Sequence, residues 1–262
     1  MRILLTGASG FIGRHTEELL RKTGHEVLPI GRDTADWRER TSAYKPEVAI
    51  HLAWEGIPDY GPEMSMRNFE MSRTLFDFLT ALGVPRIVGV GSGVERVQHN
   101  DFTVAKNAAR AAGEALAAER GVIFLWARLF FVYGPRQRQN ALIPSIVRSL
   151  GKGNPAKLKT PEAQNDFVYV GDGATALMLL ATGTAQAGTY EVGSGILASV
   201  GEVAQIAYEK FGMNFTVPLG GRNQEPPLIA DIAPLRALGW EPRVSLTEGV
   251  SMTVDWFKTH TV

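Results

Sequence analysis

Short, almost continuously apolar segments alternate with helix-period segments through the first half of the chain, and this alternation limits the possible folds most strongly. The apolar segments lie at residues 2–6, 26–30, 48–53, 86–91 and 122–129. Strands buried on both faces have this composition, whereas half-exposed strands alternate apolar and polar residues. Helical patterns separate several of these segments, at residues 11–23, 63–82 and 102–120. The order predicts βαβ units on a parallel sheet.

The second half of the chain has a different composition. From residue 134 onward prolines, glycines and basic residues become frequent, which predicts a lobe that projects from the sheet. Residues 166–172 and 188–195 each predict a return to strand structure, and residues 235–257 read as helix, turn and helix.

Composition narrows the classes of partner. The 262 residues carry a formal net charge of zero, so no global basic field favours nucleic acid or an anionic membrane. No apolar run approaches the roughly 20 residues of a membrane span, and the N-terminal segment reads as a strand entering a glycine turn rather than a signal peptide. The absence of cysteine excludes disulfides and thiolate catalysis, and the five histidines lack metal-ligand spacing. We therefore expect a cytoplasmic protein without a metal site, a nucleic acid partner or a membrane partner.

Three glycines stand between the first strand and the first helix, in the sequence TGASGFIG. Gly7 permits a tight turn, Gly10 lets the backbone approach a pyrophosphate, and Gly13 allows the helix to pack closely on the strand. The N-terminus of the helix then offers free N–H groups and the positive end of its dipole to phosphates. The spacing and its strand–turn–helix context predict dinucleotide binding.

The residues after the second strand bear on the choice of dinucleotide. An acidic residue at this point would bind the 2′-hydroxyl of an NAD ribose, but Gly31 and Arg32 occur instead. Because arginine pairs with a 2′-phosphate, the sequence favours NADP. The alternative is NAD, with Arg32 on the surface and Asp33 bound to the ribose.

Further motifs occur in a fixed order: VAIHLAW, VGVGSGVE, RLFFVYGP, LIPSIV, NDFVYVGD and ALGWEPRVSLTEGV. With the glycine turn they resemble the extended short-chain dehydrogenase/reductases of the NAD-dependent epimerase/dehydratase type, over the length of the chain. The resemblance implies an α/β fold, a Rossmann-like doubly wound parallel sheet with a smaller C-terminal substrate lobe. The expected dinucleotide-binding domain is 1–133, rejoined by 166–193, and the expected lobe comprises 134–165 and 194–262.

The same resemblance implies a small-molecule substrate, typically a nucleotide-linked sugar, that is oxidised or reduced by hydride transfer. Many members of the family form dimers through the two helices that correspond here to about 65–82 and 102–120. A homodimer is therefore expected.

The family's catalytic centre is only partly present. Family members use a Tyr-x-x-x-Lys pair with a serine or threonine: the tyrosine exchanges a proton with the substrate, the lysine lowers the tyrosine pKa and binds the nicotinamide ribose, and the serine orients the reacting oxygen. Ser92 matches the serine and Lys106 the lysine, but Phe102 occupies the tyrosine position. Phenylalanine has no ionisable proton.

Three interpretations of Phe102 remain open. Another group replaces the tyrosine, with Tyr60 and Glu95 as loop residues that border the site. Alternatively, the protein binds its cofactor without turnover. Finally, the true tyrosine lies elsewhere, although no Tyr-x-x-x-Lys occurs in the chain.

The resemblance also assigns binding residues. Those implied to contact the cofactor are Gly7, Ser9, Gly10, Phe11, Ile12, Gly13, Arg32, Asp36, Trp37, Leu52, Ala53, Trp54, Asn68, Lys106 and Phe131, with Asp36 and Trp37 in a loop near the adenine. Those implied to contact the substrate are Ser92, Arg136 and Arg222. Phe131 replaces a frequent substrate-contacting asparagine and Asn165 a frequent arginine, so a smaller or less charged substrate is an alternative.

The leading hypothesis is an NAD(P)-dependent oxidoreductase or epimerase-type enzyme that acts on a sugar-like carbonyl or hydroxyl, with ketoreduction preferred. The rival is a catalytically silent NADP-binding sensor or interaction protein, which the phenylalanine at position 102 favours.

Overall fold

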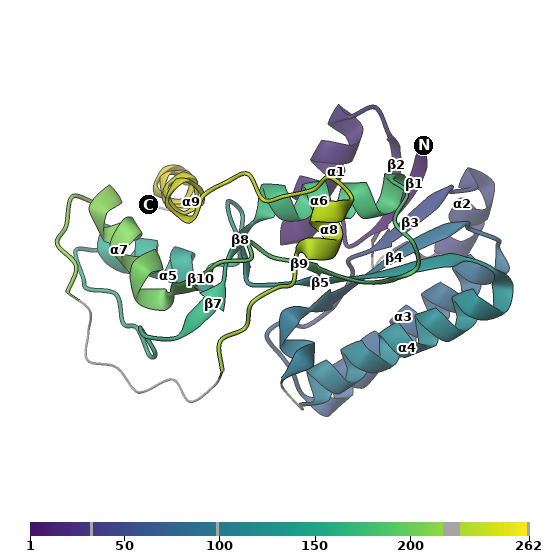
Figure 1. Cartoon of the computed structure of the whole chain (residues 1–262), viewed down its shortest axis with the longest axis horizontal. Coiled ribbons are helices and arrows are strands. Elements are labelled where there is room, and N and C mark those ends of the chain that lie inside the picture. Colours follow the sequence, from purple (N-terminus) through teal and green to yellow (C-terminus); the bar gives the residue numbers. More distant parts are fainter. Residues whose placement is uncertain (32–33, 98–99, 217–225, 261–262) are drawn as a thin grey trace. The chain divides into compact units, whose positions relative to one another are not determined.

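The computed structural model describes residues 1–31, 34–97, 100–216 and 226–260. Its contacts divide the chain into two compact units (Figure 1). The first unit comprises Met1–Leu129, Ala174–Glu191 and Pro234–Trp240, and the second comprises Phe130–Gly173, Val192–Ala233 and Glu241–Val262.

The first unit is built on a parallel sheet, which confirms the predicted α/β doubly wound fold. Its strands, within the described residues, are β1 Arg2–Thr6, β2 Glu26–Ile30, β3 Val48–His51, β4 Arg86–Ser92, β5 Ile123–Leu129 and β9 Gly188–Val192, in the order β2-β1-β3-β4-β5-β9. The registers from β2 through β5 are all parallel. The order reverses between β1 and β3, so the carboxyl ends of these strands form the switch point where such sheets bind ligands.

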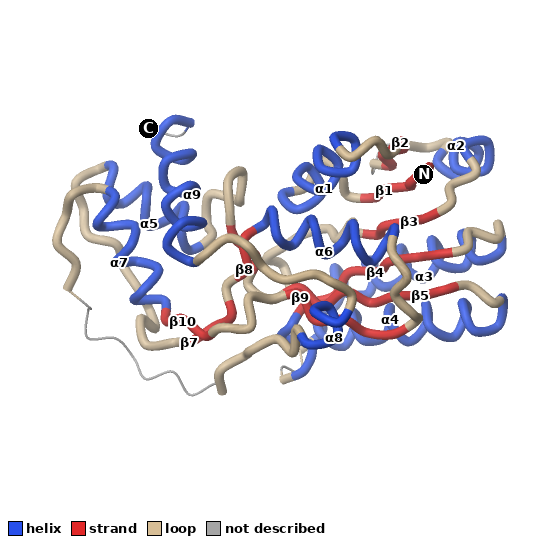
Figure 2. Tube along the Cα trace, turned by 45° about the horizontal axis from the view of Figure 1, so that its top comes forward, coloured by secondary structure: helices blue, strands red, loops and turns tan. Residues whose placement is uncertain are grey.

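Helices cover the sheet as the apolar periodicity predicts. Helices α3 Pro62–Ala81 and α4 Asp101–Arg120 run side by side along one face, and α1 Phe11–Lys22 and α6 Val170–Thr182 lie on the other (Figures 1 and 2). Two shorter helices, α2 Trp37–Tyr44 and α8 Ala233–Ala237, complete the unit's connections.

Glycine permits the close approach of α4 to the sheet. A Cβ at Gly113 would overlap the ring of Phe124 on β5. Phe124 in turn makes an edge-to-face contact with Phe76 of α3, with 5.1 Å between ring centroids. This packing fixes the distance between α4, which carries Phe102 and Lys106, and the strands beneath it.

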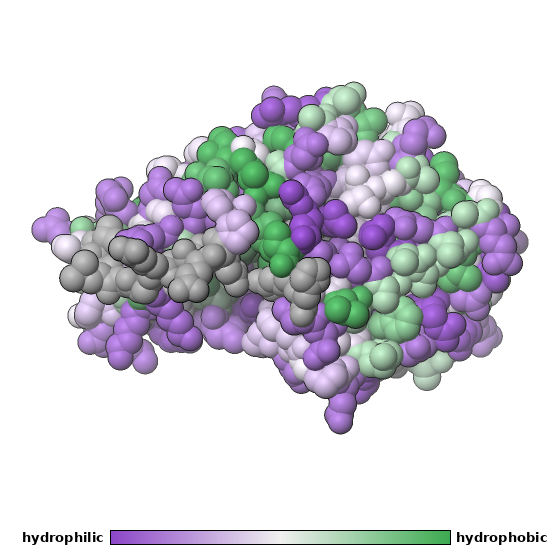
Figure 3. Space-filling model, turned by 60° about the horizontal axis from the view of Figure 1, so that its bottom comes forward, coloured by the Kyte–Doolittle hydropathy of each residue, from purple (hydrophilic) through white to green (hydrophobic). Residues whose placement is uncertain are grey.

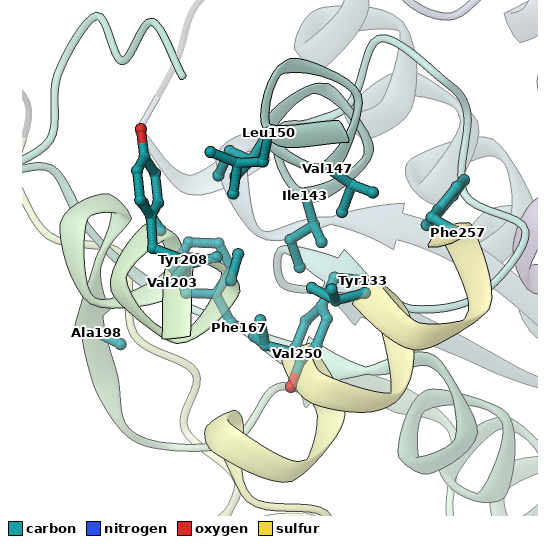
Figure 4. Close-up of a cluster of buried hydrophobic side chains, with 14 residues drawn as sticks. Tyr133, Ile143, Val147, Leu150, Phe167, Ala198, Val203, Tyr208, Val250 and Phe257 are labelled. Carbon is teal, nitrogen blue, oxygen red and sulfur yellow. The ribbon is translucent and has the colours of Figure 1, made fainter. Parts of the chain in front are cut away.

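The second unit has its own apolar core. Helices α5 Leu142–Gly151, α7 Val200–Lys210 and α9 Leu246–His260 contribute side chains that converge on Tyr133 and Phe167 (Figure 4). Two small sheets accompany them, formed by β6 Val132–Tyr133 with β8 Val168–Tyr169 and by β7 Gln164–Asp166 with β10 Leu197–Ser199.

The segment 166–172 departs from the predicted single strand. It is divided between the end of β7, the short β8 and the start of α6 at Val170. The carboxylate of Asp166 is fully buried and accepts hydrogen bonds from the backbone N–H groups of Ser194, Gly195 and Ala230. These bonds hold residues 194–195 and Ala230 against the end of β7.

No helix among the described residues is both long enough and apolar enough to cross a membrane. Within the same residues, no group of three or more histidine, aspartate or glutamate side chains is arranged to hold a metal ion.

Candidate active site

The glycine turn joins β1 to α1 with very little space around it. Gly7 has a φ of +73°, and a Cβ there would lie 2.7 Å from the backbone N of Ala53, in the segment that follows β3. A Cβ at Gly13 would overlap the carbonyl oxygen of Gly7. The turn therefore requires glycine at both positions and lies directly against residues 52–53.

This turn fits a dinucleotide. The N–H of Gly10 donates to the carbonyl of Gly7 at 3.0 Å, and helix α1 begins immediately afterwards at Phe11. The first N–H groups of a helix have no partner within the helix, and their dipole favours an anion. Ser9 is exposed and Phe11 and Ile12 are half-buried, so the predicted cofactor residues of the turn lie at an accessible helix end.

His51 ends β3 in a buried chain of hydrogen bonds. The hydroxyl of Ser72 donates to the carbonyl of Asn68 at 2.8 Å, so the Nε2–H of His51 donates to that hydroxyl at 2.9 Å. Nδ1 of His51 then accepts from the hydroxyl of Thr6 at 2.7 Å. Burial, with a smaller effect from the charge of Lys106, lowers the pKa of His51 to about 3. His51 is therefore a neutral structural residue rather than an acid or base at neutral pH.

Asn68 organises the loop between β3 and α3. Its side-chain oxygen accepts from the N–H of Glu55 at 2.6 Å, and its amide donates to the carbonyls of Glu55 and Met64 at 3.1 and 2.8 Å. Glu55 also pairs with Arg67 at 3.3 Å. In this arrangement the buried amide of Asn68 holds the loop that carries Trp54 and Tyr60.

Lys106 lies one helical turn after Phe102 on α4 and is almost wholly buried. Its Nζ donates to the carbonyl of Val90 on β4 at 2.7 Å and lies 3.8 Å from the centroid of the Trp54 ring. Burial lowers the pKa of Lys106 to about 7, and the negative charge of Glu95 opposes this effect. The contact with Trp54 favours the ammonium form through the negative face of the indole ring.

Phe102 belongs to a cluster of three aromatic side chains. Its ring meets the edge of Trp54 at 5.6 Å and is tilted against Tyr60 at 4.9 Å between centroids. Phe102 is only 8% exposed. The position at which the family carries a hydroxyl is therefore occupied by a packed apolar ring.

Ser92, at the end of β4, is fixed by a buried carboxylate. Its backbone N–H donates to Oε1 of Glu95 at 2.6 Å. The other oxygen of Glu95 accepts from Nε1 of Trp126 at 3.0 Å and from Nε of Arg128 at 3.3 Å. A Cβ at Gly91 would overlap both the carboxylate and the indole, so glycine is required beside this network.

Trp126 and Arg128 were not identified from the sequence. Both lie on β5, and Arg128 also pairs with Glu191 at 3.7 Å. One sequence feature could have identified them: Trp126 and Arg128 are two residues apart in an otherwise apolar strand.

The structure gathers some of the predicted residues and not others. The glycine turn, Leu52, Ala53, Trp54, Asn68, Ser92 and Lys106 all lie at the carboxyl ends of β1, β3 and β4 or on the helices that follow. Phe131 and Arg136 belong to the second unit, where the ring of Phe131 lies 5.8 Å from that of Phe167. Arg32 and Arg222 fall outside the described residues.

The sequence predicts a loop at Asp36 and Trp37. The prediction is wrong at Trp37, because this residue begins α2. Its ring packs edge-to-face on Phe78 at 4.9 Å and lies beneath the guanidinium of Arg38 at 4.6 Å. The apolar contact with α3 anchors a helix whose own sequence has little amphipathic character.

Residues 3–193 match the model of the NAD dependent epimerase/dehydratase family. The chain belongs to this family. The match covers more than half of the sequence and confirms the resemblance drawn from its motifs.

Curated relatives from this family include enzymes of nucleotide sugars. UDP-2-acetamido-2,6-beta-L-arabino-hexul-4-ose reductase of Pseudomonas aeruginosa is 25% identical over 80% of this chain, which spans 57% of that enzyme's length. CDP-abequose synthase of Salmonella typhimurium is 25% identical, with 95% of each chain covered.

Solved structures show the same fold. UDP-glucose 4-epimerase of Thermus thermophilus, in complex with NAD, superposes with a TM-score of 0.81 at 25% identity, with 100% of each chain covered. The RMD protein of Pseudomonas aeruginosa, complexed with NADPH, gives a TM-score of 0.85 at 22% identity, with 99% of each chain covered. Structural neighbours thus bind either dinucleotide.

The depressed pKa of Lys106 predicts a pH-dependent stability. Between about pH 7 and the ordinary lysine range the unfolded chain binds one proton more than the folded chain at this residue, so stability rises with pH. In Lys106→Met this contribution is lost. We expect the free energy of unfolding of the wild-type protein, relative to the variant, to rise by about 2 kcal/mol between pH 7 and 9.

Denaturant unfolding monitored by circular dichroism at several pH values measures this difference. Lys22→Met, which removes an exposed lysine of α1 from the same unit, controls for the loss of a positive charge. A difference between wild type and Lys106→Met that stays constant from pH 7 to 9 would contradict the prediction.

Proposed function

We propose that this protein is an NADP-dependent reductase of a nucleotide-linked keto sugar. One observation supports this most directly: Lys106 and Ser92 lie at the same sheet edge as the glycine turn. Lys106 binds the carbonyl of Val90, two residues before Ser92, and Trp54 above it follows the segment that packs on Gly7. Groups that would contact a dinucleotide and groups that would orient a reacting carbonyl therefore lie within one framework.

The residues present fit the cofactor, because the turn at Gly7 and Gly13 accepts no side chain and leads into a free helix N-terminus. When bound, the dinucleotide supplies or accepts the hydride. The turn would hold the pyrophosphate, and the Lys106 ammonium would bind a ribose hydroxyl once displaced from Trp54. The hydroxyl of Ser92 would orient the substrate oxygen, and the hydrogen bond from the Ser92 backbone N–H to the Glu95 carboxylate would maintain that geometry.

Net reduction is preferred to epimerisation for two reasons. Arg32 favours NADP. A dinucleotide that binds reduced and leaves oxidised at each turnover suits net reduction better than a dinucleotide that stays bound. The two curated relatives at 25% identity bear the names of a reductase and a synthase. Phe131, Arg136 and Arg222 remain predicted contacts with cofactor or substrate.

A second function, a catalytically silent NADP-binding sensor, is favoured by Phe102 alone. A packed phenylalanine cannot donate a proton, and its ring is integrated with Trp54 and Tyr60. Such a protein would bind the cofactor tightly and turn over no substrate.

Turnover separates the two functions. We expect purified protein with NADPH to reduce at least one member of a panel of nucleotide-linked 4-keto sugars, measured as loss of NADPH absorbance. Ser92→Ala and Lys106→Ala should each lower kcat/KM by about 10²-fold or more, because each removes a group that orients or polarises the reacting centre.

The silent sensor predicts the opposite pattern. Cofactor binding without reduction of any panel member, and a background rate unchanged in Lys106→Ala, would overturn the reductase. Epimerisation of UDP-glucose with retained NAD would move the assignment from reduction to epimerisation.

Cofactor preference tests the role proposed for Arg32. Titration calorimetry should show tighter binding of NADP than of NAD, and Arg32→Ala should weaken NADP binding by about tenfold, equivalent to about 1.4 kcal/mol, because a 2′-phosphate contact is lost. NAD affinity should change little. A wild-type preference for NAD of tenfold or more would reverse the proposal.

We also propose a homodimer formed through α3 and α4. An open apolar groove runs between these helices, lined by Pro62, Ser65, Met66, Phe69, Asp101, Val104, Ala105 and Ala108. Met66 and Val104 are 59% and 60% exposed. Figure 3 shows green, apolar surface among purple side chains on the side of the molecule where α3 and α4 lie.

Val104→Glu should convert the dimer to a monomer, because it places a charge in the apolar centre of the interface. Light scattering after size-exclusion chromatography measures the mass. Ile196→Glu, at a still more exposed apolar residue of the second unit, should leave the dimer intact. A monomeric wild-type protein at micromolar concentration would contradict the proposal.

A further inference from the structure

Reduction of a carbonyl requires a proton as well as a hydride. The hydride forms the new C–H bond, the π electrons of the C=O bond move to oxygen, and that oxygen takes a proton from a donor. Phe102 has no proton to give, so a reductase with this chain needs another donor near the same position. The need for this donor rests on the proposed function.

Two titratable residues near the centre are enclosed by their partners. The side chain of Glu95 is 0% exposed and accepts from Ser92, Trp126 and Arg128. His51 is buried between Thr6 and Ser72, with both ring nitrogens engaged. Neither side chain is exposed to meet a substrate.

Lys106 is enclosed in a different way. Its Nζ is held by the carbonyl of Val90 and covered by the ring of Trp54. Lys106 is only 7% exposed. With Nζ held by a backbone carbonyl and covered by an indole ring, Lys106 is not the exposed proton donor of this cluster.

Tyr60 is the exposed hydroxyl-bearing residue of the same cluster. Its ring lies 4.9 Å from that of Phe102, and the residue is 42% exposed. We propose that Tyr60 is the proton donor of this protein, with its phenol taking the role of the hydroxyl that is missing from position 102. The proposed donor lies in the loop before α3 instead of on α4, where the family tyrosine lies.

The loop that carries Tyr60 is held at both ends. At its start Asn68 binds both backbone groups of Glu55. Before α3, the N–H of Asp59 donates to the carbonyl of Gly56 at 2.5 Å, and the carboxylate of Asp59 accepts from the N–H of Gly61 at 2.9 Å. A fixed backbone on both sides of Tyr60 limits the positions that its ring can take, as a proton donor requires.

Donation of the proton leaves a phenolate at the exposed side chain of Tyr60. Solvent returns the proton to the exposed phenolate after each turnover.

Tyr60→Phe tests the proposal with the loss of one oxygen atom. With NADPH and the 4-keto-sugar nucleotide that the wild-type protein reduces fastest, we expect kcat to fall by about 10²- to 10⁴-fold. The Kd for NADP should stay within about twofold, because the turn and Lys106 are untouched. Tyr60→Phe/Phe102→Tyr should recover much of the lost kcat, since a phenol returns to the cluster.

Tyr190→Phe is the matched control. It also removes one phenol from the first unit, at a strand where the hydroxyl donates to the carbonyl of Gln186. Its kcat should equal that of the wild-type protein.

A second readout does not depend on turnover. Protein labelled with 3-fluorotyrosine gives a ¹⁹F resonance for Tyr60, which Tyr60→Phe identifies by its absence. Addition of the same sugar nucleotide with oxidised NADP, which cannot deliver a hydride, should shift this resonance and leave that of Tyr190 unchanged.

The outcomes separate this inference from the proposed function. Full kcat in Tyr60→Phe, or a Tyr60 resonance that does not respond to saturating ligand, would overturn the role of Tyr60 and leave the reductase intact. A wild-type protein that binds NADP but reduces nothing overturns both.

Discussion

The buried ammonium of Lys106 is the constraint on which the rest of the site depends. A charge removed from water is costly unless it is paired and hydrogen-bonded, and here its partners come from three elements. Val90 supplies a carbonyl from β4, Trp54 supplies an aromatic face from the loop after β3, and α4 carries the lysine itself. Because one amino group contacts the strand and the loop from its place on the helix, all three hold a single arrangement.

The fold could be predicted from the sequence because its signals are local. Buried strands, helix periods and the glycine turn each lie within a short window, and the family model matches the same residues. Ser92 and Lys106 were recognisable by their motifs. The carboxylate network behind Ser92 was not, since Glu95 meets Trp126 and Arg128 only through the pairing of β4 with β5. The helix that begins at Trp37 could not be predicted from its own sequence, because the contact of Trp37 with Phe78 on α3 anchors α2.

Phe102 alters the site by packing as well as by lost chemistry. A phenol at this position would add an oxygen to the cluster, whereas the phenylalanine packs on Tyr60 and on Trp54, the ring that covers Lys106. Burial lowers the pKa of Lys106, which is also covered by Trp54. Phe102 and Lys106 thus share one neighbour, the ring of Trp54.

The hydrogen bonds through His51 all run in one direction. Ala53 donates to Thr6, Thr6 to His51, His51 to Ser72, and Ser72 to the carbonyl of Asn68. Their dipoles add, and each bond polarises the next. The position of His51 needs one acceptor and one donor at opposite ends of a rigid ring, which few side chains offer. This buried chain of hydrogen bonds links the backbone beside the glycine turn to Asn68, whose side chain holds the start of the loop bearing Tyr60.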